Sequence, residues 1–339
     1  MAIEAGGEGV VAHVGLHALG AFADRLGLGD ALSARIPPAG ERLPLHDRGK
    51  VLTQAMLMLA GGGESCADVE ALRAQERLFG AVPSDSTLYR TFRQIGPATL
   101  AGLWDAMAEI RAQVWRRSSV TNTADPVVLD IDATLVEIHS ENKDGTGPTY
   151  KRTFGFHPMA CFADATGEAL AARLRPGNAG ANTVADHLAV LDDAVAQLPA
   201  EIAVGHRPGE DAELVARAVV VRTDSAGATH GFVDGCRDRN IGFAVVARSN
   251  RQVAAAISRT YTETISRWAP ARRQDGEVRD GAQAAELTDL VDLSNWPDGT
   301  RLIVRREPLH PGAQQTLLPS TEFRYWGPVH RPGRRPRDP

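Results

Sequence analysis

The 339-residue chain is poor in the residues that mark secreted or zinc-stabilised proteins. It has only three cysteines, an odd number, and no two of them stand in C-x-x-C spacing. This excludes a disulfide framework and a cysteine zinc site, so Cys66, Cys161 and Cys236 are interpreted as small core residues. Lysine is nearly absent as well, because arginine supplies all but three of the 37 cationic residues.

Long apolar runs are also missing. No stretch approaches the roughly 18 unbroken apolar residues of a membrane span. The N-terminal sequence M-A-I-E-A-G-G-E has neither the basic region nor the apolar core of a secretion signal. We therefore expect a cytoplasmic protein with no membrane partner. The net charge of −5 argues against DNA binding over the whole surface, so contact with DNA would need local basic patches.

Residues 11–118 predict a helical domain. Apolar residues recur at spacings of three and four before Gly27, between residues 51 and 59, and between residues 97 and 116. Ser65 and Asp68 are candidate caps of a further short helix. The chain is long enough for two or three domains, and this helical stretch is the first of them.

The short helix predicted at residues 84–95 has a composition suited to DNA. Its apolar anchors are Leu88, Tyr89, Phe92 and Ile95. Arg90, Arg93 and Gln94 alternate with them, as in a helix that enters the major groove. A solvated helix face explains the same pattern equally well, and the sequence leaves both readings open.

After Thr121 the pattern changes to strands. Five strands are expected, at 127–136, 157–162, 169–174, 218–221 and 242–246. Helices are expected between the third and fourth strands, at 184–198, and between the fourth and fifth, at 232–236. This βββαβαβ order lacks the regular alternation and the Gly-rich first turn of nucleotide-binding folds. It predicts a ribonuclease H-like mixed sheet flanked by helices, in which the first and fourth strands are neighbours.

Two of these strands each deliver an aspartate to one edge of the sheet. Asp132 lies in L-D-I-D-A-T-L and Asp224, 92 positions later, in V-V-V-R-T-D-S. A carboxylate in a buried strand is costly unless it is paired or metal-bound. Oxygen ligands suit Mg²⁺ (or Mn²⁺), and paired ions suit attack on phosphodiesters. The sequence therefore favours an enzyme that cuts nucleic acid, although Asp132 could cap its strand and Asp224 a helix starting at Ser225.

Four motifs together resemble the DDE transposases of bacterial insertion sequences, in particular the group numbered thirteen-eighty, over residues 10–326. They are L-D-I-D-A-T-L, G-F-H-P-M-A-C-F-A-D-A-T-G-E-A-L, L-R-P-G-N-A-G-A-N-T and V-R-T-D-S. The resemblance implies a transposase that cleaves and joins DNA strands with two Mg²⁺ ions held by three acids. It also implies double-stranded DNA as partner, at transposon ends and target, and a homodimer when the protein is intact.

Within this resemblance Asp132 is the first acid and Asp224 the second. Asp130 points to the same face of its strand as Asp132. It is an auxiliary metal ligand or a hydrogen-bonded neighbour, and we favour the neighbour. The expected domains are a helical DNA-binding domain at 1–120, a catalytic core at 121–249, a β-rich insertion at 250–326 and a Pro/Arg-rich tail at 327–339.

Two further groups of residues are candidates for DNA contact. Lys151 and Arg152 can contact phosphates on the approach to the second strand, although a solvated strand end is an equal explanation. Asn178, Asn182 and Thr183 are polar residues of the loop before the long helix. For these three we prefer a turn and a helix cap.

The third acid, which the resemblance places on a long helix after the insertion, is not recognisable. The final residues, G-P-V-H-R-P-G-R-R-P-R-D-P, are unsuited to a helix. We therefore expect a gene frameshifted or truncated near codon 327, with most activity lost. Glu263, Glu307 and Glu322 are the available substitutes. The alternatives are a DNA-binding product that inhibits intact transposase, an inactive fragment and, more weakly, a metal-dependent nuclease of another type.

Overall fold

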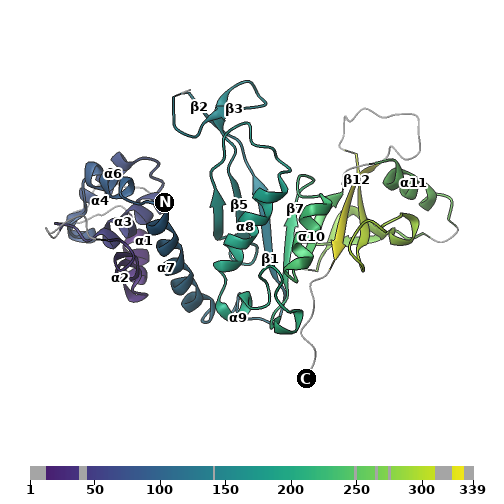
Figure 1. Cartoon of the computed structure of the whole chain (residues 1–339), viewed down its shortest axis with the longest axis horizontal. Helices are drawn as coiled ribbons and strands as arrows, with labels where there is room; N and C mark the ends of the chain where they lie inside the picture. Colours follow the sequence, from purple (N-terminus) through teal and green to yellow (C-terminus); the bar gives the residue numbers. More distant parts are fainter. Residues whose placement is uncertain are drawn as a thin grey trace, which may run out of the picture. The chain divides into compact units, whose positions relative to one another are not determined.

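The structure is a computed structural model that describes residues 13–37, 44–139, 142–247, 250–263, 266–273, 276–309 and 323–331. The chain divides into two compact units, Met1–Ser118 and Ser119–Pro339 (Figure 1). The division lies two residues before the expected boundary at residue 120. No helix in the described ranges is long and apolar enough to cross a membrane.

The first unit is helical, as the apolar spacing predicts. Its helices are α1 (Val14–Arg25), α2 (Leu28–Ser33), α3 (Arg48–Ala60), η1 (Cys66–Val69), α4 (Glu70–Arg73), α5 (Glu76–Phe79), α6 (Asp85–Arg93) and α7 (Pro97–Trp115). Short polar side chains begin several of them. Asp47 accepts a hydrogen bond from the Lys50 amide at the start of α3, and Ser65 and Asp68 form a capping box at η1.

Helix α3 is the centre of this unit because it contributes to two apolar clusters. Val51 and Ala55 pack in one with Leu88 of α6, and Leu52 packs in the other with Leu103 of α7. Gly49 at the start of α3 allows a close approach to α2. A Cβ atom there would lie 2.0 Å from the carbonyl oxygen of Gly29, so the helix crossing requires glycine.

The second unit contains the expected mixed sheet. Its core strands are β1 (Val127–Ala133), β5 (Met159–Ala163), β6 (Ala169–Arg173), β7 (Val219–Thr223) and β8 (Gly242–Ala247). They lie in the order β6-β5-β1-β7-β8, with β5 antiparallel to both β1 and β6, and with β7 parallel to both β1 and β8. This order confirms the ribonuclease H-like fold and places the first and fourth core strands side by side.

Helices cover one face of this sheet. Helix α8 (Val184–Ala196) packs on β5, β6 and β1, and α10 (His230–Asp238) packs on α8 and β8 (Figure 1). Burial alternates along the strands accordingly: Leu129, Ile131 and Val221 are buried, while their neighbours are only half-buried or exposed. Two of the three cysteines, Cys161 and Cys236, are buried, which agrees with the expected core role.

A small second sheet follows directly after β1. The strand expected at 127–136 ends at Ala133, and β2 (Val136–Ile138), β3 (Gly147–Pro148) and β4 (Phe154–Phe156) form a sheet in the order β2-β4-β3. At Gly155 of β4 a Cβ atom would lie 2.1 Å from the Val136 carbonyl oxygen. The sheet projects from the end of the main sheet at which β1 finishes (Figure 1).

The region expected as an insertion extends the main sheet. It comprises α11 (Arg251–Thr260), β9 (Ala269–Arg272), β10 (Val278–Glu286), β11 (Arg301–Pro308) and β12 (Phe323–Arg331). Strand β12 pairs antiparallel with β8, so one sheet of nine strands runs from β6 to β9. The expected start of a separate tail at residue 327 falls within β12, because Gly327–Arg331 pair with β8. The remaining described segments include α9 (Ala200–Ala203), η2 (Ala212–Leu214) and η3 (Thr288–Leu290).

Candidate active site

The two predicted acids lie at adjacent strand ends. Strands β1 and β7 are parallel, and their pairing runs from Val127 beside Val219 to Ile131 beside Thr223. Asp132 is the next residue of β1, and Asp224 directly follows the end of β7. Neighbouring strands are about 4.8 Å apart, so the fold brings the two carboxylates together.

Both acids also point to the same face of the sheet. Side chains alternate between faces, so Asp132 shares a face with Asp130, and Asp224 follows the alternation of Arg222. Asp130 and Arg222 occupy the same register position and form a direct ion pair. The face on which Asp130 meets Arg222 is therefore the face of Asp132 and Asp224.

The environment of the two acids differs from the expected buried site. Both are solvent-exposed, so the high cost of burial that suggested a metal does not apply to them. Asp132 accepts a hydrogen bond of 2.8 Å from the amide of Ala133, and Asp224 one of 2.8 Å from the amide of Ala226. The helix after Asp224 begins at His230 with Thr229 as its N-cap, so Asp224 stabilises a turn rather than capping a helix at Ser225.

Asp130 is held by arginine. Arg222 donates from Nε and Nη2 to the two carboxylate oxygens of Asp130, each at 2.6 Å, and from Nη2 to Asp164 at 2.5 Å. These hydrogen bonds, with Asp130 the main partner, raise the pKa of the Arg222 guanidinium above its ordinary value. The arrangement agrees with a hydrogen-bonded neighbour, because both carboxylate oxygens of Asp130 accept from Arg222.

The pair of exposed carboxylates suits a hydrated cation. Mg²⁺ keeps several water ligands and commonly binds proteins through one or two carboxylates. Among the described residues, no three side chains of His, Cys, Asp or Glu gather closely enough to form a metal site. The oxygen donors of Asp132 and Asp224 fit the binding of Mg²⁺ through two carboxylates.

The proposed substitutes for a third acid lie in other ion pairs. Both oxygens of Glu263 accept hydrogen bonds from Arg267, at 2.8 and 2.9 Å. Glu307 pairs with Arg279 and Arg305, and its strand β11 is three strand spacings from β7, or about 14 Å. Glu322 lies outside the described residues. Neither of the two described glutamates completes the site.

Helix α6 exposes its cations together with aromatic rings. Arg90 donates to the carbonyl of Ser86 at 3.1 Å, and the guanidinium of Arg93 lies 6.0 Å from the ring centre of Tyr89. The expectation that Tyr89 and Phe92 are anchors is wrong, because these side chains are 55% and 41% exposed. Leu88 and Thr91 are the buried residues of α6, and the two aromatic residues lie beside the arginines on its outer face.

The other candidate DNA contacts lie on loops of the second unit. Lys151 and Arg152 lie in the turn between β3 and β4, where Lys151 pairs with Glu137 at 3.2 Å and Arg152 has a left-handed backbone with φ of 65°. Tyr150 beside them is 79% exposed. Thr183 is the N-cap residue of α8, but its hydroxyl donates to the Gly180 carbonyl instead of accepting from the helix.

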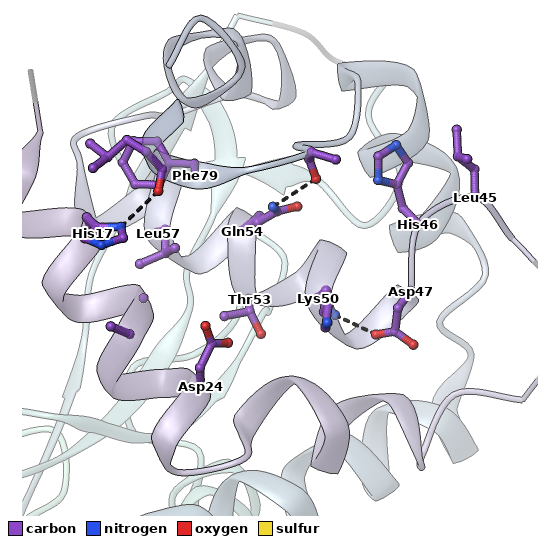
Figure 2. Close-up of a pocket in the computed structure, with 14 residues that line it drawn as sticks. His17, Asp24, Leu45, His46, Asp47, Lys50, Thr53, Gln54, Leu57 and Phe79 are labelled. Atoms are coloured by element: carbon purple, nitrogen blue, oxygen red, sulfur yellow. Dashed lines mark hydrogen bonds between the residues drawn. The ribbon is translucent and has the colours of Figure 1, made fainter. Parts of the chain in front are cut away.

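A pocket of about 590 Å³ lies wholly within the first unit (Figure 2). It is lined mainly by α1, α3 and the segment around Phe79. His17 hydrogen-bonds the Leu78 carbonyl at 2.9 Å, and Gln54 donates to the Ala81 carbonyl at 3.4 Å. These two bonds attach α5 and the segment after it to α1 and α3, so they account for part of the pocket's polar lining.

Sequence reasoning missed two residues beside the acids. Arg222 stands two positions before Asp224, and Asp164 lies in the turn that joins β5 to β6. The only signal was an arginine in an otherwise apolar run, V-V-V-R-T. Its partners depend on the register between strands far apart in sequence, which the pattern does not contain.

The sheet order and the paired strand-end acids place the second unit in the ribonuclease H-like class. Over residues 1–325 the chain matches the family described as Transposase DDE domain group 1. The chain therefore belongs to the DDE transposase family. No curated protein matches it.

Two solved structures show a distant likeness. They are "Mos1 transposase paired-end complex with left transposon end" (11% identity, 61% of each chain covered, TM-score 0.23) and "Crystal structure of the Mos1 Strand Transfer Complex" (11% identity, 66% of this chain and 67% of that chain covered, TM-score 0.22). The chain thus spans 61% of the length of the first of these. At such values no residue or contact is transferred from them.

Proposed function

We propose that the chain is a DNA transposase of an insertion sequence, of the group numbered thirteen-eighty. Its reaction would be metal-dependent cleavage of DNA strands at transposon ends and their transfer to a target. The observation that carries this proposal is the placement of Asp132 and Asp224 at adjacent ends of the parallel strands β1 and β7. Membership in the DDE transposase family supports it.

In this proposal the two carboxylates hold Mg²⁺ or Mn²⁺. When bound, the metal would supply activation of the attacking hydroxyl and stabilisation of the leaving oxygen. The main-chain amides of Ala133 and Ala226 hold the side chains of Asp132 and Asp224 at the sheet edge. Since both acids are exposed, DNA can approach them directly.

Double-stranded DNA is the proposed partner, contacted in both units. Arg90 and Arg93 lie on an exposed helical face with two aromatic rings, which suits phosphate contact with stacking. Lys151 and Arg152 lie in the β3–β4 turn of the small sheet, which projects from the end of the main sheet at which β1 finishes. We extend the proposal to a homodimer, because two transposon ends must be processed together.

The site contains two acids, Asp132 and Asp224, among the described residues, and the family resemblance implies three. Residues that bind metal as a unit lose most of their effect when one is missing. We therefore expect weak cleavage at best from this site alone. The exposed α6 favours a second candidate function, in which the chain occupies transposon ends without cutting them and competes with an intact transposase.

One experiment separates these functions. The purified chain is incubated with supercoiled plasmid carrying the DNA that flanks its gene, in Mg²⁺, Mn²⁺ or EDTA, beside D132N and D224N. Metal-dependent nicking that both substitutions abolish supports the transposase. Specific binding with no nicking supports the competing binder. Nicking that persists in both variants contradicts the proposed site, and the absence of both binding and nicking contradicts both functions.

A further inference from the structure

Arg222 forms an ionic cluster with Asp130 and Asp164, next to the candidate metal ligands Asp132 and Asp224. It donates to both oxygens of Asp130 at 2.6 Å and to Asp164 at 2.5 Å. Asp130 and Arg222 are cross-strand partners on β1 and β7, and Asp164 comes from the turn after β5. Strands β1 and β7 and the turn after β5 thus contribute one charged group each to this cluster.

The cluster is close enough to influence a metal ion at the sheet edge. Asp130 precedes Asp132 by two residues on the same face, a separation of about 7 Å at the usual rise of a strand. A carboxylate at that distance competes for a cation or for the waters around it. The side chain of Asp130 is 35% exposed, so burial does not prevent it from doing so.

What keeps Asp130 from competing is the geometry of a guanidinium. Its planar fork binds both carboxylate oxygens at once and reaches a second acid with the same nitrogen. An ammonium group is a compact charge and cannot make this pattern. Asp164 has a second role in the cluster, because its amide also bonds the Val128 carbonyl of β1 and fixes the turn beside Arg222.

We infer that Arg222 is a positioning residue that engages Asp130 and thereby confines the divalent cation to Asp132 and Asp224. This inference rests on the proposed function, since it assumes that the cation is bound at the strand ends. It assigns Asp130 no part in holding the metal, although the residue lies next to the site. It also explains why an arginine stands in the apolar run before Asp224.

The test is Mn²⁺ binding, measured on the full chain by the paramagnetic resonance signal of free Mn²⁺. The variants are R222Q, D130N and the double variant R222Q/D130N, with D164N as a matched control that keeps the Arg222–Asp130 pair. D130N and D164N are expected to bind Mn²⁺ as the unaltered chain does. R222Q is expected to bind it about tenfold more tightly or at an added site, the usual scale of outer-shell effects, and the double variant to lose this gain.

Two results would overturn the inference. One is a loss of Mn²⁺ affinity in D130N comparable to that in D132N, which would make Asp130 a ligand. The other is equal Mn²⁺ binding by R222Q and the unaltered chain. If R222Q does not fold, as judged by circular dichroism, R222K takes its place, because a lysine cannot bind both carboxylate oxygens of Asp130 in the planar bidentate pattern of an arginine.

The same series keeps this inference apart from the proposed function. If D132N and D224N bind Mn²⁺ as the unaltered chain does, the proposed metal site is wrong. The Mn²⁺ affinities of R222Q and R222Q/D130N still decide whether Arg222 prevents Asp130 from binding the cation. The unaltered chain could also bind no Mn²⁺. In that case, Mn²⁺ binding by R222Q that is lost in R222Q/D130N supports the role of Arg222, and no Mn²⁺ binding by R222Q overturns it.

Discussion

Ile131 and Thr223 are the last paired residues of the parallel strands β1 and β7. Asp132 and Asp224 follow them, so two residues 92 positions apart in sequence end adjacent strands on one face. This relationship depends only on the sheet order and the register, and both acids are exposed. A ligand that bridges them would therefore connect β1 to β7 and stabilise the folded state.

Divalent metal is expected to raise the thermal stability of the second unit. A ligand that binds only the folded state at ten times its Kd stabilises it by about 1.4 kcal/mol. We expect Mg²⁺ or Mn²⁺ to raise the Tm, EDTA to reverse the shift, and D132N and D224N to abolish it. Scanning calorimetry measures the effect. Equal shifts in the unaltered chain and D132N would place the metal elsewhere.

Helix α6 is expected to contribute phosphate contacts. Replacing Arg90 and Arg93 by alanine should weaken DNA binding similarly for all sequences and reduce the slope of log K against log salt by about two. Fluorescence anisotropy at several salt concentrations measures this. Arg25→Ala, which removes an exposed arginine from α1, is the matched control. An unchanged salt slope in the double variant would show that α6 does not contact DNA.

The sheet and its two acids could be predicted from the sequence because the signals are local. Apolar runs marked the strands, and their order relative to the helices allowed a ribonuclease H-like arrangement in which β1 and β7 are neighbours. From that order the proximity of Asp132 and Asp224 followed without any knowledge of side-chain packing. The predicted caps Ser65 and Asp68 form a capping box at η1, and the helix predicted from residue 84 begins with Ser84 as its N-cap.

Features that depend on register or on neighbouring elements could not be predicted. The contact of Arg222 with Asp130 requires a register between distant strands, and a shift of one residue would reverse the faces. The exposure of Tyr89 depends on which face of α6 packs against α3. The joining of β12 to β8 depends on pairing of backbone groups, which residue types around Gly327 do not indicate.

Arg306 is expected to stabilise the β9–β12 part of the sheet. Its guanidinium lies 4.1 Å from the ring centre of Trp268 and 4.5 Å from that of Phe323, and it donates twice to Gln283. Arg306→Ala should cost about 2 kcal/mol, the scale of a partly desolvated cation–π contact. Urea unfolding measures it, with the exposed Arg324→Ala as control. Equal midpoints for the two variants would contradict the prediction.

The second unit is expected to lose stability in mild acid through His330. Burial, and then the charge of its cross-strand partner Arg301, hold the pKa of His330 below its ordinary value of 6.5. The unfolded chain therefore takes up the proton first as the pH falls. The contribution is present above pH 6.5 and is lost as the pH falls through the folded-state pKa.

The measurement is the urea midpoint of the second unit between about pH 7 and pH 5, where a histidine titrates. His330→Gln keeps a polar side chain but cannot titrate, so its midpoint should fall less over this range. A fall equal to that of the unaltered chain would assign the pH dependence to other groups.

Gly49 is expected to be irreplaceable at the crossing of α2 and α3. A Cβ atom at this position would lie 2.0 Å from the Gly29 carbonyl oxygen and 2.5 Å from the Ser33 amide nitrogen. Both are backbone atoms, so the helices must separate to admit a methyl group, and Gly49→Ala should cost about 3 kcal/mol. Gly15 of α1 is the matched control, because a Cβ atom there meets nothing within 4 Å. Gly15→Ala should stabilise the first unit by up to about 1 kcal/mol through helix propensity. Thermal unfolding followed by circular dichroism compares the two, and a Gly49→Ala variant as stable as Gly15→Ala would show that α2 and α3 do not pack this closely.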